Sequence, residues 1–224
     1  GADAIKIQSY EASSLTLDCS ESDFQVTDGL WAGETLFSLY EKACTPFHWH
    51  ERIFRFAKEN NITVFSFPFD IPSVDMLESL GCPLYKIASF DINDHNLLRR
   101  VGATNKPVVI SSGMSTLSEI NEALFVLKSS GASNIILLKC TSAYPAHPSD
   151  MNLLTIQNMR ETFGCLVGLS DHALDHTSSI LSVAMGSCLI EKHFIDDRSN
   201  GGVDSAFSIN TSELRDLKRF TKNA

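Results

Sequence analysis

Seven short apolar runs alternate with amphipathic stretches along the chain. They are AIKIQ from Ala4, TVFSFP from Thr63, YKIAS from Tyr85, PVVISSG from Pro107, IILLKC from Ile135, LVGLSD from Leu166 and CLIEKHF from Cys188. Between them lie helix-like segments, such as the one after Thr116, where Glu119 completes a capping box and Gly131 follows the last turn. Short buried strands that alternate with helices are typical of a parallel sheet built from βα units.

The spacing of these runs is near that of a TIM (β/α)8 barrel, so we predict an α/β fold with one barrel domain over residues 1–224. Such a barrel has eight strands, and the opening GADA is similar to the loop before a second strand. We therefore expect the first βα unit to precede Gly1. The insert over residues 9–49 is long for a βα loop, which favours a functional role for it.

Composition narrows the class of partner. The chain of 224 residues has a formal net charge of −9, which argues against nucleic-acid binding and against anionic membranes and favours a small-molecule substrate. Six cysteines are scattered without a CxxC pair, as is typical of reduced thiols in the cytoplasm. No apolar run approaches the roughly 20 residues that span a bilayer.

Polar side chains recur where the predicted strands end, which is where a TIM barrel carries its active site. They are Lys6, Gln8, Lys86, Ser89, Ser111, Ser112, Lys139, Ser170, His172, Glu191 and His193. Three lysines in one mouth would repel each other unless a polyanion lies among them, so we predict a substrate with phosphate, carboxylate or both. The SSG segment supports this prediction because it leads into a helix N-terminus, where backbone N–H groups favour an anion.

Two histidines follow neighbouring predicted strands. His172 and His193 would lie side by side, with Glu191 deeper on the face of His193. Two imidazoles near a carboxylate suit a divalent metal that keeps positions open for substrate and water. A hydrogen-bonded histidine pair without metal is the alternative.

Several motifs run in order through nearly the whole chain: GADAIKIQSY, GLW, LYEKACTPFHWH, FSFPFD, YKIASFDI, SSGM, LLKCTSAYPAHPSDMNL, VGLSDH and IEKHF. In this order they resemble the sialic acid synthase family. The KIQ, GLW and TPFHWH segments are most similar to its pseudaminic acid branch.

The resemblance implies that phosphoenolpyruvate condenses with an open-chain N-acetylated amino sugar, for this branch a 2,4-diacetamido-2,4,6-trideoxy hexose. It also implies a homodimer when the protein is full length, and an antifreeze-like domain that this chain lacks. By matching position, Lys6, Lys86, Ser89, Ser111 and Ser170 would hold phosphoenolpyruvate, His172 and His193 would bind Mn²⁺ or Mg²⁺, and Ser142, Tyr144, Glu191 and Asp204 would lie near the sugar. Phe67 replaces a hydroxyl residue that is common in the family, so we expect that one hydrogen bond is either lost or supplied by Ser66 instead.

Three alternatives stay open at this point. The sugar specificity could be that of an N-acetylneuraminate or legionaminate synthase. A class I aldolase would use Lys86 or Lys139 as a Schiff base and would need no metal. A barrel that binds a partner without catalysis is the third.

Overall fold

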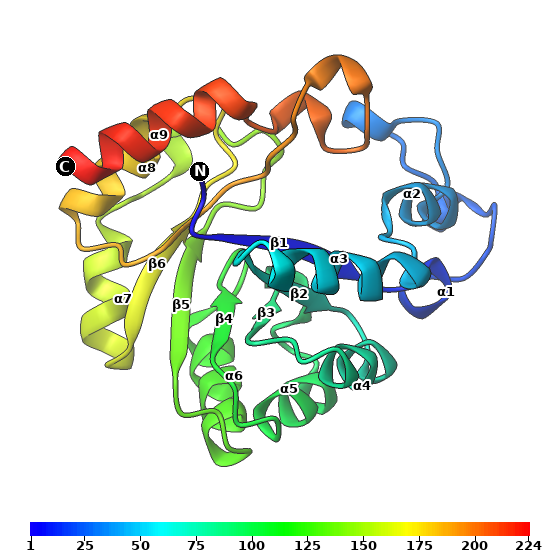
Figure 1. The fold of residues 1–224 in the computed structure, drawn as a ribbon, viewed down its shortest axis with the longest axis horizontal. Coiled ribbons are helices and arrows are strands. Elements are labelled where there is room, and N and C mark those ends of the chain that lie inside the picture. The colour runs from blue at the N-terminus through cyan, green and yellow to red at the C-terminus, as the bar shows by residue number, and fades with distance from the viewer. The chain divides into compact units, whose positions relative to one another are not determined.

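The computed structural model describes residues 1–224, and Figure 1 shows its elements. The chain divides into two compact units, one of residues 4–83 and one of residues 1–3 with 84–224. All seven predicted strands are present. That the whole chain forms one domain stays a prediction.

The unit of residues 4–83 is built on two parallel strands, β1 (Ala4–Ser9) and β2 (Thr63–Pro68). The long insert between them carries short helices and turns: α1 (Ala12–Leu15), the 3-10 turns Ser22–Phe24 and Gly29–Trp31, α2 (Leu36–Ala43) and α3 (Phe47–Glu59). Helix α4 (Ile71–Ser79) follows β2, and both α3 and α4 pack against that strand.

The second unit contains five parallel strands in chain order. They are β3 (Tyr85–Ile87), β4 (Val108–Ser111), β5 (Ile135–Cys140), β6 (Leu166–Ser170) and β7 (Ile190–Glu191). The middle of this sheet is almost wholly buried, because parallel strands are covered on both faces. Strand β7 is shorter than the apolar run CLIEKHF predicted.

Helices follow each of these strands. They are α5 (His95–Gly102), α6 (Leu117–Ser129), α7 (Thr155–Phe163), α8 (Thr177–Ala184) and α9 (Thr211–Asn223). In Figure 1, α5 and α6 lie side by side, α7 runs beside β6, and the red helix α9 lies along α8. The predicted capping box is confirmed: Thr116 Oγ1 accepts from the Glu119 amide, and the Glu119 carboxylate accepts from the Thr116 amide.

Apolar side chains of both layers form the core of this unit. Leu98, Leu127, Leu137, Ile156 and Leu169 are all fully buried. They fix the strand ends that carry the polar residues described below. None of the helices combines the length and the apolar character that a bilayer crossing needs.

Candidate functional site

The strand register decides which side chains share a face of the second sheet. Ser111 lies opposite Leu138, Leu138 opposite Gly168, Cys140 opposite Ser170, and Ser170 opposite Glu191. Since alternate residues point to the same face, these positions form one surface, to which Lys86 also belongs through Val109. This surface carries the candidate site, and it is the face of Cys140 and not of Lys139.

Lys86 is buried, and its charge has a partner within the site. Its Nζ lies 3.3 Å from Glu191 Oε1, and the two side chains are 3% and 16% exposed. The hydroxyl of Ser170 donates to the same Glu191 oxygen at 3.1 Å. Three of the predicted residues, from three different strands, therefore meet at one carboxylate.

A second group of hydroxyls surrounds Gly113. The Gly113 amide donates to Ser89 Oγ at 3.0 Å, and a Cβ at this position would collide with the hydroxyls of both Ser89 and Ser142. A side chain at this position would displace both hydroxyls, and with them the bond from the Gly113 amide to Ser89. Ser111 Oγ is buried without a hydrogen-bond partner, whereas Ser112 Oγ donates to the Leu138 carbonyl.

The orphaned Ser111 hydroxyl suggests that a ligand atom belongs beside it, because buried polar groups are almost always hydrogen-bonded. The loop that follows leads directly into the N-terminus of α6, as an anion site requires. Ser112, by contrast, is turned to the backbone of β5, and the structure does not bring it to this group.

The two histidines are close together, and each is oriented by its Nδ1 atom. Their ring centroids are 5.3 Å apart. His172 Nδ1 lies 2.9 Å from the Thr141 carbonyl oxygen, which can only accept, so Nδ1 carries the proton and Nε2 is the basic nitrogen. His193 Nδ1 lies 3.2 Å from Asp204 Oδ2. Tyr144 packs against both imidazoles, with its ring centroid 4.3 Å from that of His172 and 6.1 Å from that of His193.

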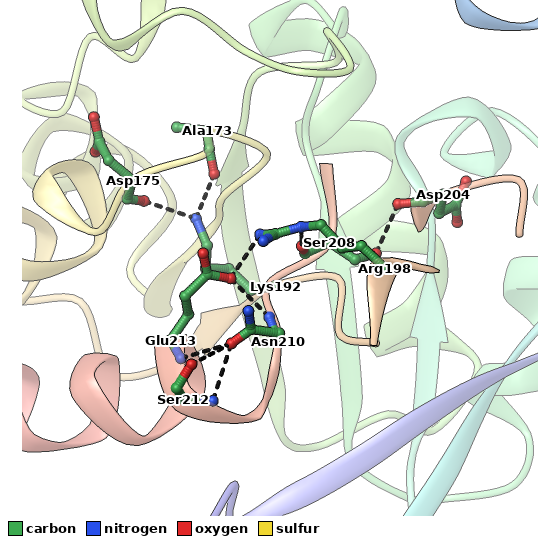
Figure 2. Close-up of polar contacts among 9 residues, drawn as sticks. All are labelled: Ala173, Asp175, Lys192, Arg198, Asp204, Ser208, Asn210, Ser212 and Glu213. Carbon is green, nitrogen blue, oxygen red and sulfur yellow. Dashed lines mark hydrogen bonds and ion pairs between the residues drawn. The ribbon is translucent and has the colours of Figure 1, made fainter. Parts of the chain in front are cut away.

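Hydrogen bonds among residues 198–213 hold Asp204 in place. Ser208 Oγ donates to the Asp204 carbonyl at 2.7 Å, and Arg198 Nε donates to the Ser208 carbonyl at 2.9 Å. The same guanidinium donates to Glu213 at 2.6 Å, and Glu213 in turn accepts from the backbone amide of Asn210, as Figure 2 shows. The partner of His193 is thus fixed through a chain of polar contacts that reaches α9.

The donor set of the two histidines fits a divalent metal. In metal sites, a ligating imidazole commonly donates its other ring N–H to a carbonyl or carboxylate, which are the partners that His172 and His193 have here. No group of three or more His, Cys, Asp and Glu side chains could hold a metal ion. The chain therefore offers two ligands, and substrate and water would supply the rest.

Lys139 is not brought to this group. Its Nζ donates to Thr141 Oγ1 at 2.7 Å and to the Cys140 carbonyl at 3.2 Å, and burial lowers the pKa of Lys139. The reason is the register, because Lys139 pairs with Leu169 on the opposite face of the sheet. The geometry does not support our prediction that three lysines form one cationic mouth.

Lys6, Gln8 and Ser66 belong to the unit of residues 4–83. Lys6 lies on the face of Phe67, with its Nζ 5.7 Å from the ring centroid, and Gln8 shares that face. Ser66 points the other way: it is fully buried, its Oγ lies 2.6 Å from Ser9 Oγ, and it donates to the Ile7 carbonyl. Ser66 therefore cannot replace the hydroxyl lost at Phe67, while Lys6 and Gln8 stay predictions.

Two titratable groups escaped the sequence analysis. Burial, and then repulsion from Asp94, raises the pKa of Asp91 to about 7, and its Oδ2 is buried without a hydrogen bond. Burial raises the pKa of the Cys140 thiol, but its interactions with His172, Ser89 and Lys86 outweigh burial and bring the pKa to about 7. Asp91 follows Ser89 by two residues, and strand alternation past Lys86 could have indicated Cys140.

Comparison with known proteins decides the family. The NeuB family matches residues 1–224, the whole chain. The chain belongs to this family. Family members include the pseudaminic acid synthase of Helicobacter pylori, 40% identical over 100% of this chain and 66% of the relative. The pseudaminic acid synthase of Campylobacter jejuni strain 81-176 is 42% identical over 96% of this chain and 63% of the relative. The chain thus spans slightly less than two thirds of the length of these curated relatives.

Solved structures confirm the fold of this NeuB family chain. The crystal structure of an N-acetylneuraminic acid synthetase from Leptospira borgpetersenii has a TM-score of 0.88 and is 31% identical, over 99% of this chain and 73% of that chain. The crystal structure of the Bacillus subtilis spore coat polysaccharide biosynthesis protein SpsE has a TM-score of 0.83 and is 30% identical, over 100% of this chain and 60% of that chain. The predicted class, an α/β TIM barrel without its first βα unit, is confirmed.

Proposed function

We propose that the protein is a pseudaminic acid synthase, a transferase that joins phosphoenolpyruvate to an open-chain 2,4-diacetamido-2,4,6-trideoxy hexose and releases phosphate. The observation that carries the proposal is the identity of 40–42% to curated pseudaminic acid synthases. The N,N'-diacetyllegionaminic acid synthases of Campylobacter jejuni and Legionella pneumophila are 36% and 32% identical. The buried Lys86, the hydroxyls around it and the histidine pair support the proposal.

The anion pocket would bind phosphoenolpyruvate. Lys86 supplies the positive charge, and the hydroxyls of Ser89, Ser111 and Ser170 supply hydrogen bonds. Glu191 keeps Lys86 and Ser170 aimed at one point before substrate arrives, so less orientational freedom is lost on binding. Because Lys86 is desolvated, its charge acts strongly on the developing phosphate and carboxylate charges.

The histidine pair would hold the divalent metal, Mn²⁺ or Mg²⁺, which supplies Lewis-acid polarisation of the sugar aldehyde when bound. Thr141 and Asp204 keep the Nδ1 atoms occupied, which would leave the Nε2 atom of each ring to bind the metal. We expect Tyr144 and Ser142 to contact the amino sugar. Burial raises the pKa of Tyr144 well above its usual value, so its hydroxyl stays protonated and can donate to the sugar.

The remaining partners follow from the same proposal. We expect a homodimer of the full-length protein and a location in the cytoplasm, where the six free cysteines would stay reduced.

A product assay tests the function directly. The full-length protein receives phosphoenolpyruvate, Mn²⁺ and one sugar from a panel of diacetamido trideoxy hexoses and N-acetylmannosamine, and mass spectrometry identifies the product. We expect the pseudaminic acid mass with the altrose-configured sugar and no product after chelation. Turnover only with the legionaminic or N-acetylneuraminic precursor would assign the protein to another branch, and borohydride trapping of a Schiff base would indicate an aldolase.

Variants at the anion pocket sharpen the assay. Lys86→Ala should weaken phosphoenolpyruvate binding by on the order of 1.5–3 kcal/mol, the contribution of a charged hydrogen bond, and should weaken sugar binding far less. Lys128→Ala is the matched control, since Lys128 is exposed at the end of α6. Calorimetry with each substrate measures both effects, and equal losses for the two substrates would contradict the role of Lys86.

A further inference from the structure

A second buried ion pair lies directly beside the two histidines. Lys192 Nζ is 3.0 Å from Asp171 Oδ2, and the side chains are 4% and 0% exposed. Burying two charges costs several kcal/mol per ion before their attraction offsets it, so such pairs are weak stabilisers compared with apolar packing. The pair is therefore unlike an ordinary core contact and calls for a separate explanation.

Its position in the sequence supplies one. Asp171 immediately precedes His172, and Lys192 immediately precedes His193. Because side chains alternate along an extended chain, the ion pair points away from the candidate site while its two neighbours point toward it. One contact behind the sheet thus joins the two segments that carry the histidines.

Every donor of the lysine is used in this joint. Besides Asp171, Lys192 Nζ donates to the Ala173 carbonyl at 2.6 Å and to the Asp175 carbonyl at 3.0 Å, and Figure 2 shows both bonds. An ammonium group has three N–H bonds, and all three have acceptors here. Lys192 therefore contacts the side chain of Asp171 before His172 and two backbone carbonyls, of Ala173 and Asp175, after it.

The carboxylate is equally well satisfied. Asp171 Oδ1 accepts from the Ala173 amide at 2.8 Å, and Oδ2 accepts from Ser179 Oγ of α8 at 2.5 Å. The Asp171 amide itself donates to the Glu191 carbonyl at 2.9 Å. The segment around His172 can therefore move relative to that around His193 only if several of these bonds break together.

We propose that Asp171 and Lys192 are positioning residues, which hold His172 and His193 at the separation and orientation in which both imidazoles bind one divalent ion. This inference rests on the proposed function, because that function assigns the metal to the histidine pair. The contacts with Thr141 and Asp204 orient each ring separately, whereas the ion pair fixes the position of one ring relative to the other.

The test is the affinity for Mn²⁺ alone, measured by electron paramagnetic resonance of the free ion. Lys192→Met should weaken it 10- to 100-fold, the usual effect of losing a partner in the outer shell of a metal site. Ser179→Ala, which removes one hydrogen bond to Asp171, should weaken it less. Leu127→Ala is the control. Removing this buried side chain should lower the melting temperature, and helix α6 carries no residue of the histidine segments.

Lys192→Met leaves a buried carboxylate without its cationic partner, which lowers the stability of the fold. The double variant Asp171→Asn with Lys192→Met removes both charges and should recover the fold. A folded double variant that binds Mn²⁺ as weakly as expected supports the positioning role. A folded double variant with wild-type affinity overturns it.

Imidazole ¹⁵N spectra of the metal-free protein separate this inference from the proposed function. They report which ring nitrogen carries the proton. If wild-type protein binds no Mn²⁺, the metal assignment fails, but a mixture of tautomers at His172 and His193 in the variants and a single tautomer in wild type still supports positioning. If wild-type protein binds Mn²⁺ and the variants match it in both affinity and spectra, positioning fails and the proposed function stands.

Discussion

Buried carboxyl groups of the second unit differ in the polar partners that they have. Glu191 has Lys86 and Ser170, and Asp171 has Lys192, Ser179 and a backbone amide. Asp91 has a buried oxygen without any hydrogen bond, and only its distant attraction to Lys86 opposes the effect of burial. Ionising a carboxyl group in this position costs free energy, so the group keeps its proton up to a higher pH.

Replacing Asp91 with Asn should therefore have an effect that depends on pH. Between the usual carboxyl pKa of 3.8 and about 7, the unfolded chain releases the proton of Asp91 while the folded chain keeps it. The free energy of unfolding of the wild type thus falls as pH rises through this window. Urea titrations from pH 4 to pH 8 should show Asp91→Asn becoming steadily more stable relative to wild type.

A difference between the two proteins that stays constant across this pH range would contradict the raised pKa of Asp91. Turnover measured on the same samples shows whether the carboxyl also takes part in the reaction, because Asn matches its shape but cannot exchange a proton.

The sequence pattern indicated residues that the structure brings together, but it did not give the direction of every side chain. Lys86, Ser170 and Glu191 converge because each occupies the same phase of its strand, which the register makes plain. Ser66 lies one residue out of phase with Phe67, and Lys139 one residue out of phase with Cys140, so each points to the opposite face of its own sheet from that neighbour. Polar character alone does not give the phase of a strand, and only the pairing with its neighbours does.

At the scale of whole elements, the period of the apolar pattern was sufficient. All seven strands were predicted, because buried parallel strands form continuous apolar runs between turn signals. The exception is β7, which ends at Glu191 although the apolar run continues to Phe194. Beyond Glu191 the chain pairs only once more, in an isolated bridge from Phe194 to Ile209. An apolar run shows that a segment is suited to burial, but not how long its neighbour stays beside it.

Helix α6 provides a test at this scale, because its N-terminus forms the proposed anion pocket. Thr116→Ala removes the acceptor for the Glu119 amide and should lower the free energy of unfolding by about 0.5–2 kcal/mol. Thr116→Ser keeps the hydroxyl and is the matched control. Urea titration measures both variants, and equal losses in the two would show that the methyl group of Thr116, not the cap, supplies the stability.

The whole molecule is stabilised by packing and not by covalent bridges. All six cysteines are free, and fully buried apolar side chains occur in both layers of the second unit. A chain of 224 residues buries enough apolar surface to fold without cross-links. Because no cysteine is in a disulfide, the reactivity of each thiol can be measured in the native protein.

Thiol reactivity should therefore sort the cysteines by their burial. In denaturant without reductant, Ellman's reagent should titrate all six thiols, because none is paired. In the native protein, exposed Cys188 should react first, whereas buried Cys82 and Cys140 should react only as fast as the structure opens. Cys188→Ser should remove the fast phase and leave the slow ones unchanged. Fewer than six thiols in denaturant, or an unfolding midpoint that falls on adding reductant, would show that a disulfide contributes to the stability of the fold.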